Sequence, residues 1–122
     1  MDIVEVYSNE HGETHFRKSI IDLEDRDYAP PSEPVQVSAD IRLTIGNFLA
    51  APPGWDDEFH PTPRRQLAVM LSGQATISTT DGEKVNVGPG SVVLLNDRSS
   101  KGHLTRVLGN ADASFLLVGL AD

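Results

Sequence analysis

The stretch GWDDEFHPTPRRQLAVMLSG, residues 54–73, decides the fold of this chain. It opens and closes with glycine, and between the glycines it spaces His60, Thr62 and Gln66 at even positions. The run 67–71, Leu-Ala-Val-Met-Leu, follows directly and is apolar throughout. A short apolar run bounded by glycine is typical of a buried β-strand.

If this stretch is extended, the sequence predicts which face of the strand each side chain is on. Alternate residues of a strand point to opposite sides, so Arg64 is expected on the same side as Thr62 and Gln66. Ala68 and Met70 share the parity of Gln66 and would line a barrel interior with apolar surface.

The rest of the chain has the punctuation of an all-β domain. Short runs rich in Val, Ile, Leu and Thr alternate with Gly, Pro, Asn and Asp, and Asp81-Gly82 is the pair expected in a tight hairpin turn. No amphipathic pattern of about ten residues or more predicts a helix. A β-sandwich or small barrel of two antiparallel sheets follows. Strands are expected at 3–7, 14–23, 41–49, 67–71, 74–80, 83–87, 91–95, 103–108 and 114–120.

Two segments carry more specific predictions. Residues 24–34 are charged and then rich in proline, and proline removes a backbone donor and fixes φ. This segment is therefore predicted to be a connecting loop. Residues 41–49 alternate apolar Ile and Leu with Arg and Thr, which predicts a half-buried strand.

Composition limits the class of partner. The chain has 122 residues, no cysteine and a formal net charge of −8, with a pI of about 4.8. One domain spanning residues 1–122 is expected, and thiol chemistry is excluded. An acidic surface repels phosphate backbones and anionic lipid, so neither nucleic acid nor a membrane is expected as a partner. The first residues lack the basic start and apolar run of a signal peptide, so a cytoplasmic location is expected.

Three predicted strand regions are apolar on both faces: 67–71, 92–95 and 115–118. A sandwich strand needs only one dry face, so the second face must meet a lid, a covering segment or another subunit. A homodimer is the first expectation. The alternative is that the N-terminal strands cover those faces within one chain.

The spacing within residues 54–73 resembles the first motif of the cupin family, G(X)5HXH(X)3E(X)6G. A weaker match to the second motif covers approximately residues 90–107, where Asn96 replaces the usual proline, His103 follows a longer loop and Val107 stands at the asparagine position. The phrases HPTPRRQ and DRSSKGHLTR are similar to those of a subgroup of small bacterial cupins. The resemblance to a single-domain, RmlC-like cupin implies a double-stranded β-helix, or jelly-roll barrel. Its N-terminal strands would pack on the barrel or on a partner subunit.

The resemblance also implies a ligand set. Typical cupins hold a divalent metal with two histidines and a glutamate from the first motif and one histidine from the second. The corresponding residues here are His60, Thr62, Gln66 and His103, a set that lacks one imidazole and one negative charge, so metal affinity is expected to fall. His60, Gln66 and His103 remain the candidate ligands for Zn, Mn, Fe or Ni. Open positions would be filled by water or by His15, Asp56, Asp57 or Glu58.

A metal-free alternative uses the same pocket. His60 would then act as a general base, because histidine can exchange a proton near neutral pH. The further candidates for ligand binding are His15, Trp55, Thr62, Arg64, Met70 and Thr105. Plainer roles stand beside these: Trp55 could anchor its loop, Arg64 could pair with neighbouring acids, and Met70 could simply fill the core.

Two functions from different classes follow. The first is a small-molecule enzyme or binding protein, metal-dependent or not, whose substrate is a small polar organic acid or a sugar-like compound. The second is a non-catalytic ligand-binding or scaffold protein in which the metal site has degraded.

Overall fold

The structure, a computed structural model, describes all 122 residues. It contains eleven strands and no helix, so no helical segment is present that is long and apolar enough to cross a bilayer. The strands are β1 (Asp2–Ser8), β2 (Thr14–Ile20), β3 (Leu23–Arg26), β4 (Val35–Ser38), β5 (Leu43–Ala51), β6 (Gln66–Ser72), β7 (Gln74–Ser78), β8 (Lys84–Val87), β9 (Val92–Asn96), β10 (Leu104–Leu108) and β11 (Ala113–Leu120).

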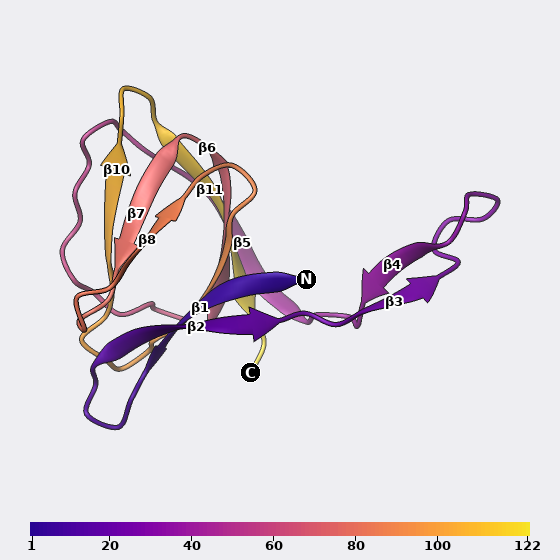
Figure 1. Cartoon of the computed structure of the whole chain (residues 1–122), viewed down its shortest axis with the longest axis horizontal. Helices are drawn as coiled ribbons and strands as arrows, with labels where there is room; N and C mark the ends of the chain where they lie inside the picture. The colour runs from indigo at the N-terminus through magenta and orange to yellow at the C-terminus, as the bar shows by residue number, and fades with distance from the viewer.

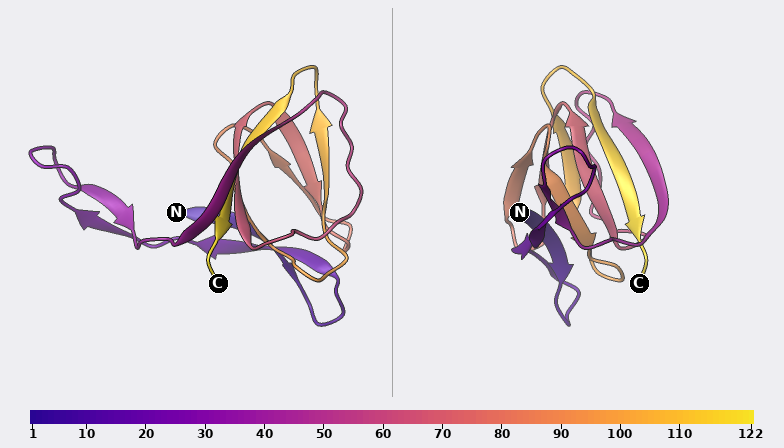
Figure 2. Two further views of the ribbon diagram at one scale, coloured as in Figure 1. Left: turned by 180° about the vertical axis from the view of Figure 1, so that it is seen from behind. Right: turned by 90° about the vertical axis from the view of Figure 1, so that its right-hand side faces the viewer.

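Two sheets enclose a small barrel (Figure 1). The larger sheet has the strand order β2-β1-β9-β6-β11-β5, and the smaller sheet has the order β10-β7-β8. Strands β3 and β4 pair only with each other and lie outside the barrel, as both figures of the ribbon show (Figures 1 and 2). The predicted all-β barrel is confirmed. The expectation of purely antiparallel sheets is corrected at one place, because β1 runs parallel to β9.

Two local predictions were wrong. The predicted loop 24–34 begins too early, because β3 extends to Arg26 and pairs with β4. The prolines lie in the turn of this hairpin, where their missing N–H groups are not needed for hydrogen bonds between the strands. The predicted half-buried strand 41–49 overlaps β5, which is exposed along its whole length except at Ala51. Strand β5 is the last strand of the larger sheet, with a neighbour on one side only.

The barrel interior is filled from both sheets. Met70 of β6 and Val6 of β1 are almost completely buried, and Ile77 and Val107 from the smaller sheet belong to the same cluster. Burying a side chain of this size contributes roughly 1.5–3 kcal/mol. The barrel therefore has one shared core, and the polar residues that face its interior are held by this core.

The outer face of the larger sheet is also apolar, as the two-faced strand regions predicted. Ile3, Leu94 and Leu120 form a second, smaller cluster on that face. However, β1 and β2 extend the sheet sideways from β9 and do not lie over it. The alternative in which the N-terminal strands cover this face is therefore wrong beyond one corner, and Leu71 and Phe48 stay exposed.

A buried acid joins the N-terminal hairpin to the barrel. The carboxylate of Glu5 accepts two hydrogen bonds from the Arg17 guanidinium, at 3.1 and 2.9 Å, and one from Asn96 Nδ2 at 3.0 Å. The side chain of Glu5 is buried. The hydrogen bonds from Arg17, more than any other contact, hold the pKa of Glu5 below its ordinary value. This contact therefore stabilises the fold only while Glu5 is ionised.

Replacing Glu5 with Gln is expected to make the free energy of unfolding less dependent on pH in the acid range. Because the folded pKa lies below the ordinary value of 4.5, the unfolded chain binds a proton that the folded chain rejects between those two values. The wild type should have the full contribution above the unfolded pKa and lose it as pH falls through the folded pKa. The variant should lose about 1–3 kcal/mol near neutral pH through the weakened pairing of Arg17. Urea unfolding across the acid range measures both effects. Parallel curves for the two proteins would contradict the assignment.

Candidate functional site

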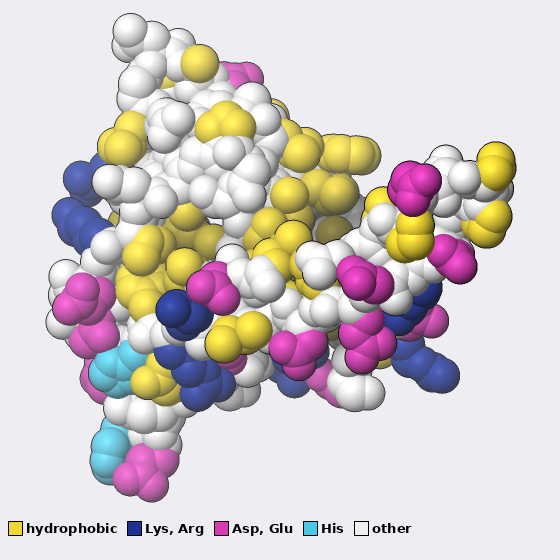
Figure 3. Space-filling view, turned by 45° about the vertical axis from the view of Figure 1, so that its right-hand side comes forward, with side chains coloured by type: hydrophobic (Ala, Val, Ile, Leu, Met, Phe, Trp, Pro, Cys, Tyr) yellow, Lys and Arg dark blue, Asp and Glu magenta, His cyan; other side chains and the backbone are white.

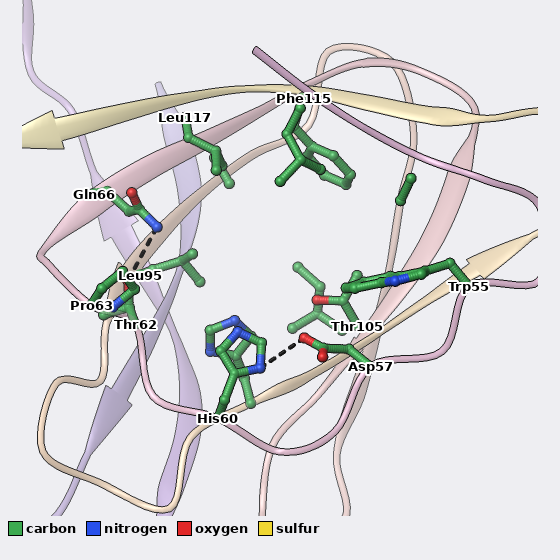
Figure 4. Close-up of a pocket in the computed structure, with 15 residues that line it drawn as sticks. Trp55, Asp57, His60, Thr62, Pro63, Gln66, Leu95, Thr105, Phe115 and Leu117 are labelled. Carbon is green, nitrogen blue, oxygen red and sulfur yellow. Dashed lines mark hydrogen bonds and ion pairs between the residues drawn. The ribbon is translucent and has the colours of Figure 1, made fainter. Parts of the chain in front are cut away.

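A cavity of about 120 Å³ lies between the two sheets. Its apolar wall comes mainly from the larger sheet, and it shares Ala68, Ile77, Leu95 and Phe115 with the barrel core. Several polar side chains also line the cavity, most of them around His60, with Thr62 and Gln66 on the side away from Asp57 (Figure 4). The polar residues are Asp57, His60, Thr62, Gln66, His103 and Thr105.

Backbone pairing brings the two pocket histidines together. His60 N–H donates to His103 C=O and His103 N–H donates to His60 C=O, both at 3.0 Å. The two imidazole centroids lie 5.0 Å apart with an interplanar angle of 51°. Two further backbone bonds, from Asp57 N–H to Thr105 C=O and from Val107 N–H to Trp55 C=O, extend the contact. Residues 55–60 thus run along β10 at the edge of the smaller sheet.

Gly102 permits this close approach. Its φ is +87°, a conformation that L side chains rarely adopt, and a Cβ atom at this position would overlap the carbonyl group of His60. Only glycine satisfies both demands at once. The residue before His103 therefore determines how closely the two histidines can meet.

Each histidine is oriented by an aspartate. His60 Nδ1 lies 2.7 Å from Asp57 Oδ2 and 2.9 Å from the carbonyl oxygen of Glu58. His103 Nδ1 lies 2.7 Å from Asp97 Oδ2. A carboxylate accepts and cannot donate, so in each neutral ring Nδ1 carries the proton and Nε2 has a free lone pair. Both Nε2 atoms are therefore available to a ligand.

The two aspartate–histidine pairs differ in depth. The side chain of His60 is 46% exposed, whereas those of His103 and Asp97 are 5% and 0% exposed. The second carboxylate oxygen of Asp97, Oδ1, is buried with no hydrogen-bond partner. A buried carboxylate with one unsatisfied oxygen depends strongly on its remaining partner. His60 lies near the solvent, and His103 forms the fixed inner part of the site.

Thr62 and Gln66 form a second polar wall. The Thr62 hydroxyl donates to Arg64 C=O at 2.6 Å and accepts from Gln66 Nε2 at 3.2 Å. Figure 4 shows this contact across the hollow from Asp57 and Trp55. Thr62 and Gln66 are therefore both used for contacts within the chain, and Gln66 keeps its carbonyl oxygen and one N–H of Nε2 for a ligand.

These donors do not fit a resident divalent metal. No group of three His, Asp or Glu side chains is arranged to hold a metal ion, and Asp57 and Asp97 bind the Nδ1 atoms of the histidines. Two neutral imidazoles and one amide oxygen supply no negative charge, and Zn, Mn and Fe sites are usually built from imidazole together with carboxylate or thiolate.

Six of the predicted site residues line the cavity: Trp55, His60, Thr62, Gln66, His103 and Thr105. Three do not. His15 contacts Asp81 Oδ2 at 2.8 Å and Asn9 Nδ2 at 3.3 Å, beside Tyr7. Met70 is buried in the barrel core and does not line the cavity.

Arg64 is the third predicted residue outside the cavity. Residues 63–65 form a bend before β6, so the strand alternation that put Arg64 beside Gln66 does not continue through them. Its side chain lies against Gly119 and makes no ion pair with the acidic residues 56–58. Arg106 pairs with Asp56 instead, at 3.0 Å.

Sequence reasoning missed two features of the candidate site. The first is the orienting role of Asp57 and Asp97. Asp57 was treated as one of three alternative acids, although its position three residues before His60 is compatible with a contact, and Asp97 lies in an ordinary polar loop. The second is the apolar wall, whose residues come from strands far apart in the chain: Leu49, Ala51, Leu95, Phe115 and Leu117.

Comparisons with known proteins agree on the fold. No protein-family model matches the chain, and no curated protein matches its sequence. The cupin domain of Cnp3 from Schizosaccharomyces pombe aligns with a TM-score of 0.53 and 10% identity, covering 100% of this chain and 83% of that one. A predicted oxalate decarboxylase from Thermotoga maritima aligns with a TM-score of 0.48 and 17% identity, over 83% of this chain and 94% of that one.

A cupin superfamily protein from Desulfitobacterium hafniense aligns with a TM-score of 0.46 and 15% identity, over 69% of this chain and 84% of that one. At such low identity the likeness concerns the fold alone, and it rests on the Cnp3 domain, which covers the whole chain. The chain has the cupin fold, a jelly-roll β-barrel.

Replacing Gly102 with Ala should separate the two histidines and destabilise the barrel. Gly82 provides a matched control, because its φ is +89° but nothing lies within 4 Å of a Cβ atom placed there. Gly82→Ala should cost about 1 kcal/mol from backbone strain. Gly102→Ala should cost about 3 kcal/mol or more, because overlap with His60 adds to that strain. Urea unfolding measures both costs, and equal costs would show that the close approach is unimportant.

Proposed function

We propose that the cavity binds a small organic molecule that has an apolar body and a carboxylate or similar acidic head group. One observation carries this proposal: the imidazoles of His60 and His103 face one cavity, and each has its Nδ1 fixed by an aspartate. The head group would lie against the two Nε2 atoms. The apolar body would lie against Phe115 and Leu117.

The size and lining of the cavity narrow the ligand class. A dry cavity of about 150 Å³ accepts a benzene ring in other proteins, and this cavity is of similar volume, about 120 Å³. The hydroxyl groups of a sugar would lose their hydrogen bonds against Leu49, Phe115 and Leu117. Among the two classes expected from the sequence, a small organic acid is therefore favoured over a sugar-like compound.

The aspartates make the pair suited to an acidic ligand. A carboxylate cannot accept a hydrogen bond from a lone pair, so each Nε2 that contacts the head group must first gain a proton, either from the acid form of the ligand or from water. The imidazole then becomes a cation, and the carboxylate at Nδ1 stabilises that charge. Asp97 is especially suited to this role because its pairing with His103 is buried. The ligand anion and the imidazolium then form a charge-assisted hydrogen bond, and at His103 this bond lies in a buried part of the cavity, where such bonds are strong.

The same arrangement supports His60 as a general base. Its Nε2 can receive a proton from a ligand, and its exposed side chain allows that proton to pass on to water. Binding needs both histidines, whereas proton transfer needs only the solvent-accessible one. A ligand that binds without turnover would identify the chain as a binding protein, the second function that the sequence allows.

Replacing either pocket histidine with Ala should weaken binding of a small aromatic or branched carboxylate, such as benzoate or isovalerate. A hydrogen bond to a charged group contributes about 1.5–3 kcal/mol, so a loss of roughly 10- to 100-fold in affinity is expected. Calorimetric titration measures it. His15→Ala is the matched control, since His15 is also paired with an aspartate but lies outside the cavity, and its affinity should equal that of the wild type.

Two outcomes would overturn the proposal. One is that no carboxylate of this size binds to the wild type while a sugar does. The other is that His15→Ala weakens binding as much as His103→Ala. Elemental analysis of the same protein, purified without added metal, separates this proposal from a metal centre, because stoichiometric metal that is lost in His103→Ala would favour the metal centre.

A further inference from the structure

The hairpin of β3 and β4 forms an arm, residues 22–40, that stands clear of the barrel (Figures 1 and 2). The two strands pair over four residues each, from Leu23 opposite Ser38 to Arg26 opposite Val35. No hydrogen bond or ion pair joins the arm to the rest of the chain. Its remaining hydrogen bonds, such as that from Ser32 N–H to Ala29 C=O, are local.

Such an arm needs a packing partner. An isolated two-stranded hairpin is only marginally stable in water, because it buries little apolar surface. Contact with the barrel ends at Ile21, whose N–H donates to Met1 C=O, and resumes at Arg42, whose C=O accepts from Ala121 N–H. A hairpin that has no hydrogen bond or ion pair with the barrel between these points requires a packing surface that the single chain does not supply.

Exposed apolar side chains are concentrated on the arm and on β5. Phe48 on β5 is 80% exposed and Tyr28 on the arm is 70% exposed. Figure 3 shows hydrophobic side chains gathered on the side of the barrel next to the arm. Exposed apolar side chains gathered in this way mark an interaction surface. Eight of the thirteen exposed large hydrophobic residues lie between positions 20 and 49: Ile20, Tyr28, Val35, Ile41, Leu43, Ile45, Phe48 and Leu49.

Strand β5 also has a free backbone edge. It ends the larger sheet and pairs only with β11. An unpaired, apolar edge strand is a template for association with another chain unless charge or a covering segment blocks it. Nothing in the chain covers β5, whose side chains are exposed from Leu43 to Ala50.

Charge indicates that the partner is a second copy. The arm has one base, Arg26, and six acids, none in an ion pair within the chain: Asp22, Glu24, Asp25, Asp27, Glu33 and Asp40. Three arginines surround the end of β11. Leu120 N–H donates to Arg65 C=O, Ala121 N–H donates to Arg42 C=O, and Arg64 lies against Gly119. These arginines also lack an ion pair within the chain.

An acidic arm and a basic, apolar acceptor on one chain are complementary to each other. Because the arm points away from its own barrel (Figure 1), it cannot satisfy its own acceptor. A two-fold axis between two copies satisfies both arms at once and closes the assembly. We propose that this chain forms a symmetric dimer in which the arm of each copy packs across β5 of the other, with its acids facing Arg42, Arg64 and Arg65.

Sedimentation of three proteins tests the dimer. The wild type should sediment at twice the chain mass of 13.2 kDa. Phe48→Glu should raise the dimer dissociation constant about 30-fold or more, the effect of removing an interface residue of the strongest class. Leu108→Glu is the matched control, because Leu108 is also exposed but belongs to the smaller sheet, and it should leave the dimer intact. A monomeric wild type at NMR concentrations, or an unchanged Phe48→Glu dimer, would overturn the proposal.

A spin-label experiment tests the position of the arm without any core substitution. The chain has no cysteine, so Ser32→Cys in the turn of the arm accepts a single label. Spin-labelled chain without ¹⁵N is mixed with ¹⁵N chain that carries no spin label. Only contacts between copies then broaden the observed amide signals. Broadening of residues 43–49 is expected. A dimer with no broadening there, or with broadening confined to the smaller sheet, would overturn the arrangement.

Discussion

Two backbone hydrogen bonds of 3.0 Å join His60 to His103 and fasten the segment after β5 to the start of β10. Everything that makes the cavity a site follows from this contact. It closes one side of the barrel, sets the two imidazoles 5.0 Å apart, and places Trp55 and Asp57 along β10. The contact is possible because the residue between the polar loop and His103 is a glycine, whose missing Cβ leaves room for the His60 carbonyl. The polar site inside the apolar barrel therefore depends on the close approach of the backbones of Gly102 and His60.

The aspartates turn this contact into a chemically defined site. A histidine in an apolar cavity could present either nitrogen, and the carboxylate at Nδ1 selects Nε2 as the one that faces a ligand. Asp97 does so while fully buried and with one oxygen unpartnered. A buried carboxylate depends on the partners it has, so the contact with His103 is the one that holds Asp97 in place. Thr62 and Gln66, which stand at two ligand positions of the motif that the sequence resembles, hydrogen-bond to each other instead.

The sequence predicted the barrel well because its information is local. Glycine spacing, short apolar runs and the Asp81-Gly82 turn each depend on a few neighbouring residues, and the strands follow closely. The pairing of His60 with His103 was expected only through resemblance to cupins. The position predicted for Arg64 was wrong because residues 63–65 form a bend, so side chains do not alternate between two faces there. Asp97 was missed because contact between positions 97 and 103 depends on the path of the loop between them.

Strand β5 shows a different limit of sequence reasoning. Its alternating pattern indicates one buried face, yet the strand is exposed from Leu43 to Ala50, and it also has a free backbone edge. The pattern predicts that one face of the strand is covered, and no part of the single chain covers it. The same mismatch applies to the arm, whose apolar residues have no partner within the chain. In both places the dimer that we propose would supply the missing burial.

The central claim is that both pocket imidazoles offer an unprotonated Nε2 to one shared cavity. Long-range ¹H–¹⁵N correlation of the histidine rings reads the protonated nitrogen of each neutral ring directly. The account predicts the Nδ1–H tautomer for both His60 and His103, together with a nuclear Overhauser effect between the two rings. An Nε2–H tautomer at His103, or two rings with no mutual effect, would contradict it.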